Sequence, residues 1–343
     1  MRIAVVGAGM VGVSCALALQ RRGVAVTLID RLSPGHETSH GNAGILSPSS
    51  LIPFNNPTLW KQLPGLLSGK NPGFHYNLQY LTQEFKWAWK FLAHARQTPF
   101  QHTLIALNGL ISQSRRIHQT WMEQAGIRHR LRDQGWLFLY RTEAAWQASQ
   151  WARNLYTQHG IAFTSLDPGE LRELEPGLNP VFSKGVWFPG AWDIHGLDKV
   201  LSKADHVVLA LGPFSKAFLA QQGLMNLPMA FERGSHMHYA PGPNALNRPI
   251  YDTGGGYVLS PMNKGWRLTT GVELNALQAP VQDTQLDQAE ARAREALILG
   301  NRLDRQIWRG SRPTLPDSRP MIGACPGETG IWLALGHQHI GFS

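Results

Sequence analysis

Three glycines near the start of the chain have the spacing that binds a phosphate group. Gly7, Gly9 and Gly12 form a Gly-x-Gly-x-x-Gly pattern between an apolar run, residues 3–6, and an expected helix, residues 10–22. The first glycine permits a tight turn, the second lets the backbone approach a pyrophosphate, and the third lets the helix pack close to the strand. The free N–H groups and positive dipole end of the helix then face the phosphates. The pattern predicts a dinucleotide-binding strand–turn–helix unit.

An acidic residue lies at the distance expected for a ribose contact. Residues 24–29 are expected to form a second strand, and Asp30 at its end follows Gly12 by 18 residues (30 − 12). A carboxylate there can accept hydrogen bonds from ribose hydroxyls. A glycine turn in an ordinary βα unit is the alternative, and the strand, helix and acid together disfavour it. The expected cofactor contacts are Val6, Gly7, Ala8, Gly9, Met10, Val11, Gly12, Asp30 and Arg31.

A small polar loop follows the second strand and narrows the choice of dinucleotide. Residues 38–44 read Thr-Ser-His-Gly-Asn-Ala-Gly. This segment resembles a loop of the flavin-dependent amino-acid oxidoreductases of the D-amino-acid oxidase superfamily, most closely the bacterial D-amino-acid dehydrogenases, where it lies along the isoalloxazine ring. The resemblance implies non-covalent FAD, contacted by Ser39, Asn42, Ala43, Gly44 and Leu46. Taken alone, the loop would be interpreted as an ordinary polar surface segment.

Two later segments are similar to the same superfamily. Residues 206–212 resemble its second flavin-domain strand, which ends here at Gly212, and residues 331–341 resemble its last strand with a Gly-His-x-x-x-Gly turn. The resemblance implies that the turn faces the flavin end of the cofactor. The residues it assigns to that contact are Gly336, His337 and Gly341.

Residues 308–320 resemble the Gly-x-Arg-Pro-x-x-Pro-Asp-x-x-Pro segment of the superfamily. The resemblance implies that Arg312 clamps the substrate carboxylate, and a guanidinium does offer a rigid two-pronged donor that matches a carboxylate. A surface arginine beside a proline turn is the alternative. Tyr257, on an expected strand, is assigned to the same substrate site. No side chain is assigned as a catalytic acid or base, because the flavin carries the hydride chemistry.

The composition is that of a globular protein with a sizeable core. The chain has 343 residues, of which 43% are hydrophobic and 16% charged, with a formal net charge of +9. That charge suits an anionic membrane surface or an acidic substrate, whereas scattered basic residues and the lack of a recognised motif argue against nucleic acid. Two cysteines give no disulfide framework. We expect no metal site, because His236 and His238 lack a third ligand.

The sequence predicts a cytoplasmic protein. It contains no apolar run of about 18 residues that would cross a membrane, and no cleavage site follows its apolar start. An expected helix, residues 81–92, carries Phe85 and Trp89 interleaved with Lys86 and Lys90. This helix can pack on the core or lie on the cytoplasmic face of the inner membrane, and the pattern leaves both open.

We expect an α/β fold with an α+β second domain. Residues 1–50, 199–222 and 310–343 would form a discontinuous Rossmann-like FAD-binding domain, and residues 51–198 and 223–309 an antiparallel-sheet substrate or cap domain. Two features depart from the superfamily. The link at 197–205 is shorter than the dozen or more residues that a parallel crossover needs, so the sequence carries an apparent internal deletion. The closing helix of the superfamily is also missing after Ser343.

The resemblance implies oxidative deamination of D-amino acids, or of related secondary amino acids, to 2-oxo acids and ammonia. A hydride would pass from the α-carbon to flavin N5, and the electrons would go to a quinone-type acceptor. Three alternatives remain open: an amino-acid oxidase that uses O₂, an NAD-dependent dehydrogenase of the two-domain type, and a non-catalytic remnant of the fold. The two departures from the superfamily are the reason why the third alternative, a non-catalytic remnant, is retained.

Overall fold

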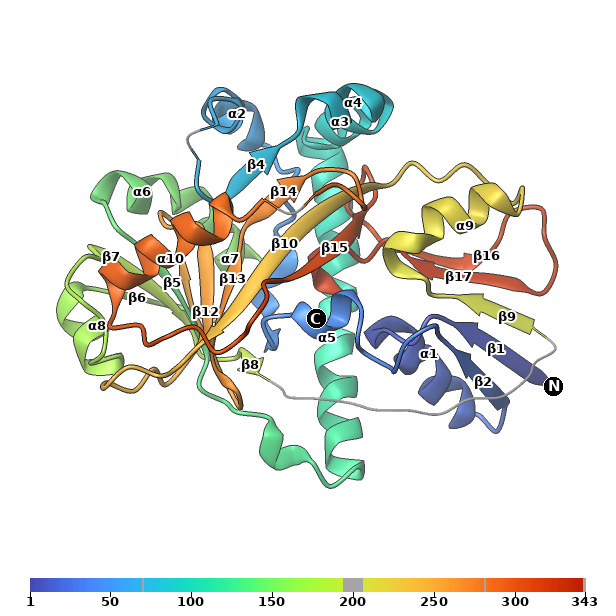
Figure 1. The fold of residues 1–343 in the computed structure, drawn as a ribbon, viewed down its shortest axis with the longest axis horizontal. Helices are drawn as coiled ribbons and strands as arrows, with labels where there is room; N and C mark the ends of the chain where they lie inside the picture. The colour runs from blue at the N-terminus through green and yellow to red at the C-terminus, as the bar shows by residue number, and fades with distance from the viewer. Residues whose placement is uncertain (70, 194–205, 281, 342–343) are drawn as a thin grey trace.

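A computed structural model describes residues 1–69, 71–193, 206–280 and 282–341. Two sheets organise the molecule, a smaller one of five strands and a larger one of ten (Figure 1). The predicted short link at 197–205 and the end of the chain at Ser343 lie outside the described residues. The α/β class expected from the sequence is confirmed.

The smaller sheet has the strand order β16-β17-β9-β1-β2. Its strands are β1 (Arg2–Val6), β2 (Ala25–Ile29), β9 (His206–Leu209), β16 (Met321–Ala324) and β17 (Ile331–Leu335). All neighbours are parallel except β16, which pairs antiparallel with β17. Within the described part of the chain, β2 is one outer edge of this sheet. The central strand is β9, which joins β1 from the start of the chain to β17 from its end.

Helix α1 (Met10–Gln20) packs close to the smaller sheet because glycine allows it. A Cβ at Gly12 would lie 1.8 Å from the carbonyl oxygen of Gly7, a distance no side chain can accept. Apolar side chains of β1, β2 and α1 form the core beneath, with Val5 fully buried and Leu28 nearly so. The predicted strand–glycine turn–helix–strand unit is confirmed.

The larger sheet has the order β4-β14-β10-β13-β12-β11-β5-β7-β6, with β15 on the other side of β10. The strands are β4 (Phe74–Tyr76), β5 (Trp136–Tyr140), β6 (Thr164–Leu166), β7 (Lys184–Phe188), β10 (Ala230–Tyr239), β11 (Ile250–Asp252), β12 (Tyr257–Met262), β13 (Gly265–Thr270), β14 (Val272–Leu274) and β15 (Trp308–Thr314). The sheet is mixed rather than purely antiparallel, because β11 pairs parallel with β5 and β14 with β4. A short pair, β3 (Ile45–Leu46) and β8 (Trp192–Asp193), lies outside both sheets.

Strand β15 connects the two halves of the molecule in a way that the predicted domain boundary does not capture. Its seven residues pair with β10 from Ala230↔Thr314 to His236↔Trp308. The predicted start of the last cofactor-domain segment, residue 310, therefore falls inside a strand of the larger sheet. The chain enters the smaller sheet only afterwards, at β16.

Helices cover the larger sheet and extend beyond it. They are α2 (Leu59–Leu67), α3 (Leu78–Gln83), α4 (Phe85–His94), α5 (Gln97–Gln124), α6 (Glu143–Ala148), α7 (Gln150–Gln158), α8 (Pro168–Leu174) and α10 (Thr284–Ala296), while α9 (Ser215–Gln221) follows β9 beside the smaller sheet. The expected helix over 144–159 is interrupted at Ser149, and that over 81–92 at Glu84. Helix α10 packs Leu286, Ala289 and Ala293 into the sheet core.

Helix α4 divides its aromatic residues between core and solvent. Trp87 and Phe91 are buried and stacked, and Trp87 Nε1 donates a hydrogen bond to the carbonyl of Thr314 at 2.9 Å. Phe85 and Trp89 are 60% and 71% exposed. The core packing predicted as one option is confirmed for one face, and the other face presents aromatic rings to the outside. In the described residues we find no helix with the length and apolar character needed to cross a membrane.

Candidate active site

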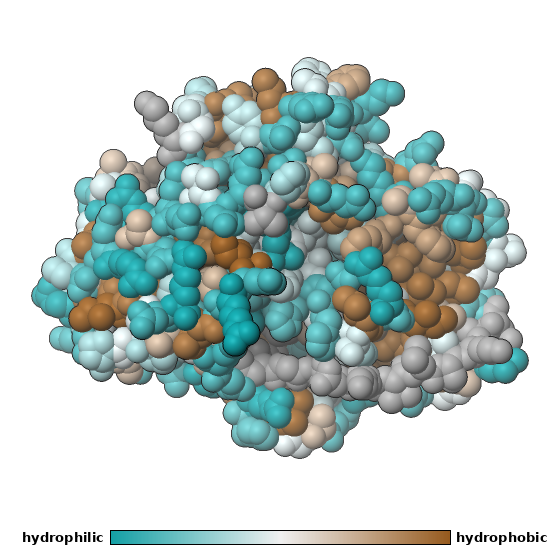
Figure 2. Space-filling model, viewed as in Figure 1, coloured by the Kyte–Doolittle hydropathy of each residue, from teal (hydrophilic) through white to brown (hydrophobic). Residues whose placement is uncertain are grey.

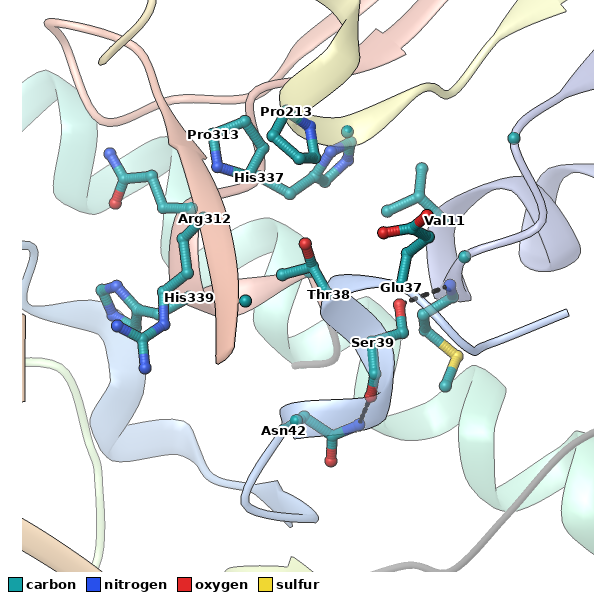
Figure 3. Close-up of a pocket in the computed structure, with 18 of the residues that line it drawn as sticks. Val11, Glu37, Thr38, Ser39, Asn42, Pro213, Arg312, Pro313, His337 and His339 are labelled. Carbon is teal, nitrogen blue, oxygen red and sulfur yellow. Dashed lines mark hydrogen bonds between the residues drawn. The ribbon is translucent and has the colours of Figure 1, made fainter. Parts of the chain in front are cut away.

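A cavity of about 590 Å³ lies between the two sheets. The parallel strands of the smaller sheet contribute residues at their carboxyl ends, including Val6, Ile29, Ala210 and Leu335. The carboxyl edge of such a sheet is where open α/β folds bind ligands. The larger sheet contributes the opposite wall through β5, β10, β12, β13 and β15. Figure 3 shows side chains of α1, of residues 37–42, of β15 and of the turn after β17 around this space.

The glycine turn forms one end of the cavity. Gly7 has a φ of +106°, and a Cβ there would lie 2.2 Å from the carbonyl oxygen of Ala210, so only glycine fits. Ser39 Oγ accepts a hydrogen bond from the Met10 N–H at 2.9 Å, which ties the polar loop to the start of α1. Among the described residues, the N–H of Gly9 has no protein partner. A free amide beside a helix N-terminus suits a pyrophosphate.

Asp30 and Arg31 form the wall beyond the end of β2. Both carboxylate oxygens of Asp30 accept backbone N–H groups, from Ala8 at 2.6 Å and from Leu32 at 3.0 Å. Each oxygen keeps a second lone pair for a ribose hydroxyl. Arg31 pairs with Glu37, and its guanidinium lies 4.0 Å from the ring centre of Phe214. The pair of Arg31 and Phe214 therefore bridges β2 and the segment after β9.

The polar loop is fixed from the larger sheet. Arg267 on β13 donates from Nη1 to the carbonyl oxygens of Asn42 at 2.6 Å and of His40 at 3.0 Å. Asn42 Oδ1 accepts from the N–H of Gly44 at 2.7 Å. The indole of Trp308 packs against Gly41, where a Cβ would lie 1.8 Å from the ring. These contacts set the loop in one conformation along the cavity.

Arg312 extends from β15 into the cavity and is the only described lining residue of the larger sheet with a permanent charge. Its guanidinium lies over Gly234, where a Cβ would be 2.7 Å from Nη2. Within the described residues the guanidinium has no hydrogen-bond or ion-pair partner. Burial lowers the pKa of Arg312, and the charge of Glu232, its neighbour across the strands, opposes that change. An unpaired buried cation of this kind is ready to bind a carboxylate.

The turn after β17 closes the cavity beside Arg312. Gly336 has a φ of +75°, and Gln338 has a φ of +50° although it is not glycine. A left-handed non-glycine residue costs about 1–3 kcal/mol and is held there by its surroundings. His337 and His339, on either side of Gln338, both line the cavity. Burial lowers the pKa of His337 to about 4; burial and then the charge of Arg312 lower that of His339 to about 4.

Most of the predicted cofactor residues meet at this cavity. Those that line it are Val6, Gly7, Gly9, Met10, Val11, Asp30, Arg31, Ser39, Asn42, Ala43, Gly212, Gly336, His337 and Gly341. The remaining four, Ala8, Gly12, Gly44 and Leu46, do not line it. Gly12 supports the turn from behind, and Leu46 is fully buried against Met122 and Leu131.

Tyr257 is not at the site, contrary to the prediction. It is 1% exposed and packs in the core of the larger sheet, near Asp252 and Arg141. Its neighbour Val258 lines the cavity instead. Successive side chains on a strand point to opposite faces, so a shift of one residue moves a side chain from the core to the site.

The sequence interpretation missed several lining residues of the larger sheet. They are Trp136, Gly234, Val258, Thr269, Thr270, Trp308 and Gly310. None of them carries a charge, and the wall that they form is largely apolar. Phe214 and His339 were also missed, although His339 lies two residues after His337 within the predicted turn and could have been considered.

The residues present fit FAD. A glycine turn with a free amide, an acid at the end of β2, a fixed polar loop and a second glycine turn all line one cavity. The first turn has no room for a side chain at Gly7, so the backbone there can approach a ligand. The donor set suits a pyrophosphate, a ribose and an uncharged planar ring.

Comparisons with known proteins agree with this geometry. The family profile described as FAD dependent oxidoreductase (DAO) matches residues 2–201 and 195–343. A D-amino-acid oxidase from Bradyrhizobium diazoefficiens is 29% identical over an alignment that covers 99% of this chain and 91% of the relative. A D-amino acid dehydrogenase from Neisseria meningitidis is 25% identical, with 100% and 92% covered.

Solved structures show the same fold. Glycine oxidase from Geobacillus kaustophilus aligns with a TM-score of 0.68 at 19% identity, covering 99% of this chain and 90% of that one. L-proline dehydrogenase from P. horikoshii has a TM-score of 0.68 at 16% identity, with 99% and 89% covered. L-alpha-glycerophosphate oxidase from Mycoplasma pneumoniae, solved with FAD bound, also gives 0.68, at 16% identity, with 99% and 90% covered.

The alignments also locate the missing segment. The alignment to the Bradyrhizobium relative has 387 positions, so at least 44 of them (387 − 343) have no residue in this chain. The family profile breaks into two matches that meet at residues 195–201, where the sequence analysis placed the deletion. The chain belongs to the DAO family of FAD-dependent oxidoreductases.

Proposed function

We propose that this enzyme oxidises D-amino acids, or related secondary amino acids, to 2-oxo acids with release of the amine. The observation that carries this proposal is the unpaired guanidinium of Arg312 in an otherwise uncharged wall of the cavity. A carboxylate is the group that such a cation binds most tightly, because two parallel N–H···O bonds can form. The names of the Bradyrhizobium and Neisseria relatives support a D-amino acid as the molecule to which this carboxylate belongs.

The chain contributes orientation and exclusion of water. Arg312 holds the carboxylate, and the uncharged wall of Trp136, Val258 and Thr270 receives the side chain. Bound FAD supplies the acceptor for the two electrons that leave the α-carbon. Fixing the carboxylate and the side chain at two points sets the face of the α-carbon that meets the cofactor, and such positioning is a large part of catalysis.

The visible absorption spectrum of the purified protein tests this proposal. Under anaerobic conditions, bands near ~450 nm from bound flavin should bleach on addition of a D-amino acid mixture and persist with the matching L-amino acids. Arg312→Lys keeps the charge but loses the two-pronged donor, so it should raise KM about 10- to 100-fold, the value of a charge-assisted hydrogen bond. Bands that no D-amino acid bleaches would refute the proposed reaction.

We further propose a quinone-type electron acceptor and peripheral contact with an anionic membrane. The exposed rings of Phe85 and Trp89 on α4 support this, together with Trp60 and Leu78 on the neighbouring segments. Figure 2 shows apolar and hydrophilic surface interleaved along the upper edge over α2–α4. Residues 38–122 contain one acidic residue, Glu84, which pairs with Lys216. The basic residues of that stretch are Lys61, Lys70, Lys86, Lys90, Arg96, Arg115 and Arg116.

Vesicle flotation tests the membrane contact, and reoxidation of the flavin tests the electron acceptor. The protein should float with phosphatidylglycerol vesicles and not with phosphatidylcholine vesicles, and Phe85→Ser/Trp89→Ser should abolish flotation. Trp332→Ser is the matched control, because Trp332 is 47% exposed on the smaller sheet, away from α4. Rapid reoxidation of the bleached flavin by O₂, with slow reoxidation by a soluble quinone, would overturn the proposal of a quinone-type acceptor.

A further inference from the structure

The strained turn after β17 places a second titratable group beside Arg312. Among the described residues only Ser318 and Gln338 combine a side chain with a left-handed backbone, with φ values of 57° and 50°. Gln338 is buried, and it lines the cavity together with His337 and His339. A bridge between Thr314 and His337 ties the turn to β15, which carries Arg312. Such strain persists at sites where a fixed geometry is used.

The imidazole of His339 lies next to the guanidinium of Arg312 in Figure 3. Burial, and then the charge of Arg312, lower the pKa of His339. His339 lines the cavity and keeps accessible surface. His339 is therefore a neutral base at neutral pH, open to whatever Arg312 binds.

An amino acid brings a chemical requirement to this position. It arrives as a zwitterion, and its ammonium is attached to the same carbon as the carboxylate that Arg312 holds. Hydride can leave the α-carbon only when the nitrogen has a lone pair to form the C=N bond, so the ammonium must first lose a proton. A base within reach of Arg312 is needed for that step.

The carboxylates near the cavity are poorly placed to take this proton. Glu232 is the neighbour of Arg312 across the strands but is 2% exposed and does not line the cavity. Glu37 lies across the cavity from Arg312 in Figure 3 and pairs with Arg31, and Asp30 follows β2 of the smaller sheet. Within the described lining residues, His339 is the titratable base next to Arg312.

We propose that His339 accepts the proton of the substrate ammonium once the carboxylate has bound Arg312. One N–H bond of the ammonium breaks and an N–H bond forms on the imidazole, which leaves a neutral amine. The hydrogen on the α-carbon would then depart with its electron pair to bound FAD, and the nitrogen lone pair would form the iminium that water hydrolyses. This inference rests on the proposed function.

The pairing of Arg312 with a carboxylate also makes His339 a better acceptor at that moment. In the free site the Arg312 charge disfavours an imidazolium beside it. A bound carboxylate offsets that charge, so the field that opposes protonation weakens. Substrate binding and proton acceptance are thus linked through one pair of side chains.

The test compares anaerobic flavin bleaching by a D-amino acid at pH 7 and at a pH above the pKa of the substrate ammonium, where the free amine is already neutral. The wild-type protein should bleach at both pH values. His339→Asn keeps a polar side chain that cannot take the proton, so it should be about 100-fold slower at pH 7 and close to wild type at the higher pH. An equal loss of bleaching rate at both pH values, or no loss at pH 7, would overturn the proposed role of His339.

Two further measurements keep the outcome unambiguous. Benzoate, a carboxylate without an amine, should perturb the flavin spectrum of His339→Asn at the wild-type concentration, which shows that the Arg312 site is intact. By ¹³C-histidine NMR, the signal absent from His339→Asn should titrate at a higher pH with benzoate bound, and an unchanged titration would contradict the linkage. A wild-type flavin that no D-amino acid bleaches would instead overturn the proposed function.

Discussion

Replacing Gly234 with alanine should displace Arg312 without unfolding the protein. Gly234 lies on β10 under the guanidinium, and its backbone is in a conformation open to any residue. The new Cβ would lie 2.7 Å from Nη2, 3.0 Å from Nη1 and 3.1 Å from Cζ of Arg312. These atoms are the far end of a flexible side chain with no other partner, so they can move away at little cost in stability.

The structure sets the size of the displacement. Ordinary contact begins at 3.4 Å, so the guanidinium must retreat by about 0.7 Å (3.4 − 2.7) toward the cavity. Misplacement of a bound substrate by about 1 Å can cost about 100-fold in rate. We expect Gly234→Ala to lower kcat/KM for a D-amino acid by about 10- to 100-fold, while the free energy of unfolding changes by less than about 1 kcal/mol.

Three measurements decide the outcome. Thermal unfolding and the flavin spectrum should match wild type, and the substrate dependence of flavin bleaching should shift to higher concentration. Gly109→Ala is the control, because Gly109 lies on an exposed turn of α5 with nothing within 4 Å of the new Cβ, and it should be stable and fully active. A Gly234→Ala protein with wild-type kcat/KM would refute the placement of the substrate carboxylate against Arg312.

Three other changes test the surroundings of the site. Ser39→Ala removes the hydrogen bond to the Met10 N–H, so flavin affinity in fluorescence titration should fall about 5-fold, as for loss of about 1 kcal/mol. Trp87→Phe leaves the buried Thr314 carbonyl without its partner and should lower stability in urea unfolding by about 1–3 kcal/mol. Acid should destabilise the protein from pH ~6.5 downward. Histidines with a lowered folded pKa bind protons more readily when unfolded, so Tm should fall as pH drops from 6.5 to 4, and a flat profile would contradict the neutral state of His236, His337 and His339.

The sequence predicted the first part of the site well because its contacts are local. The strand, glycine turn, helix and second strand follow one another within 30 residues, and glycine has a specific steric reason at each position. Gly12 is constrained by Gly7, five residues before it, whereas the contact of Gly7 with Ala210, which follows β9, is long-range. Asp30 was placed correctly at the cavity for the same reason.

The opposite wall could not be predicted because it depends on which strands lie side by side. Trp136, Gly234 and Val258 come from strands β5, β10 and β12, which the sheet order brings to one wall. No local pattern states that order. Tyr257 shows the same limit at the scale of one residue, since the correct strand was found but not the face that its side chains present.

The position of β1 between β2 and β9 has a consequence for how the protein is made. Its two neighbours, β2 and β9, begin at residues 25 and 206, and β9 must in turn receive β17, which ends at residue 335. A chain emerging from the ribosome grows by about 5–20 residues per second, so β1 waits on the order of ten seconds or more for its second partner. During that time one edge of an apolar strand stays open to other chains. The nucleotide half of the cavity is thus the first part to be synthesised and the last to be completed.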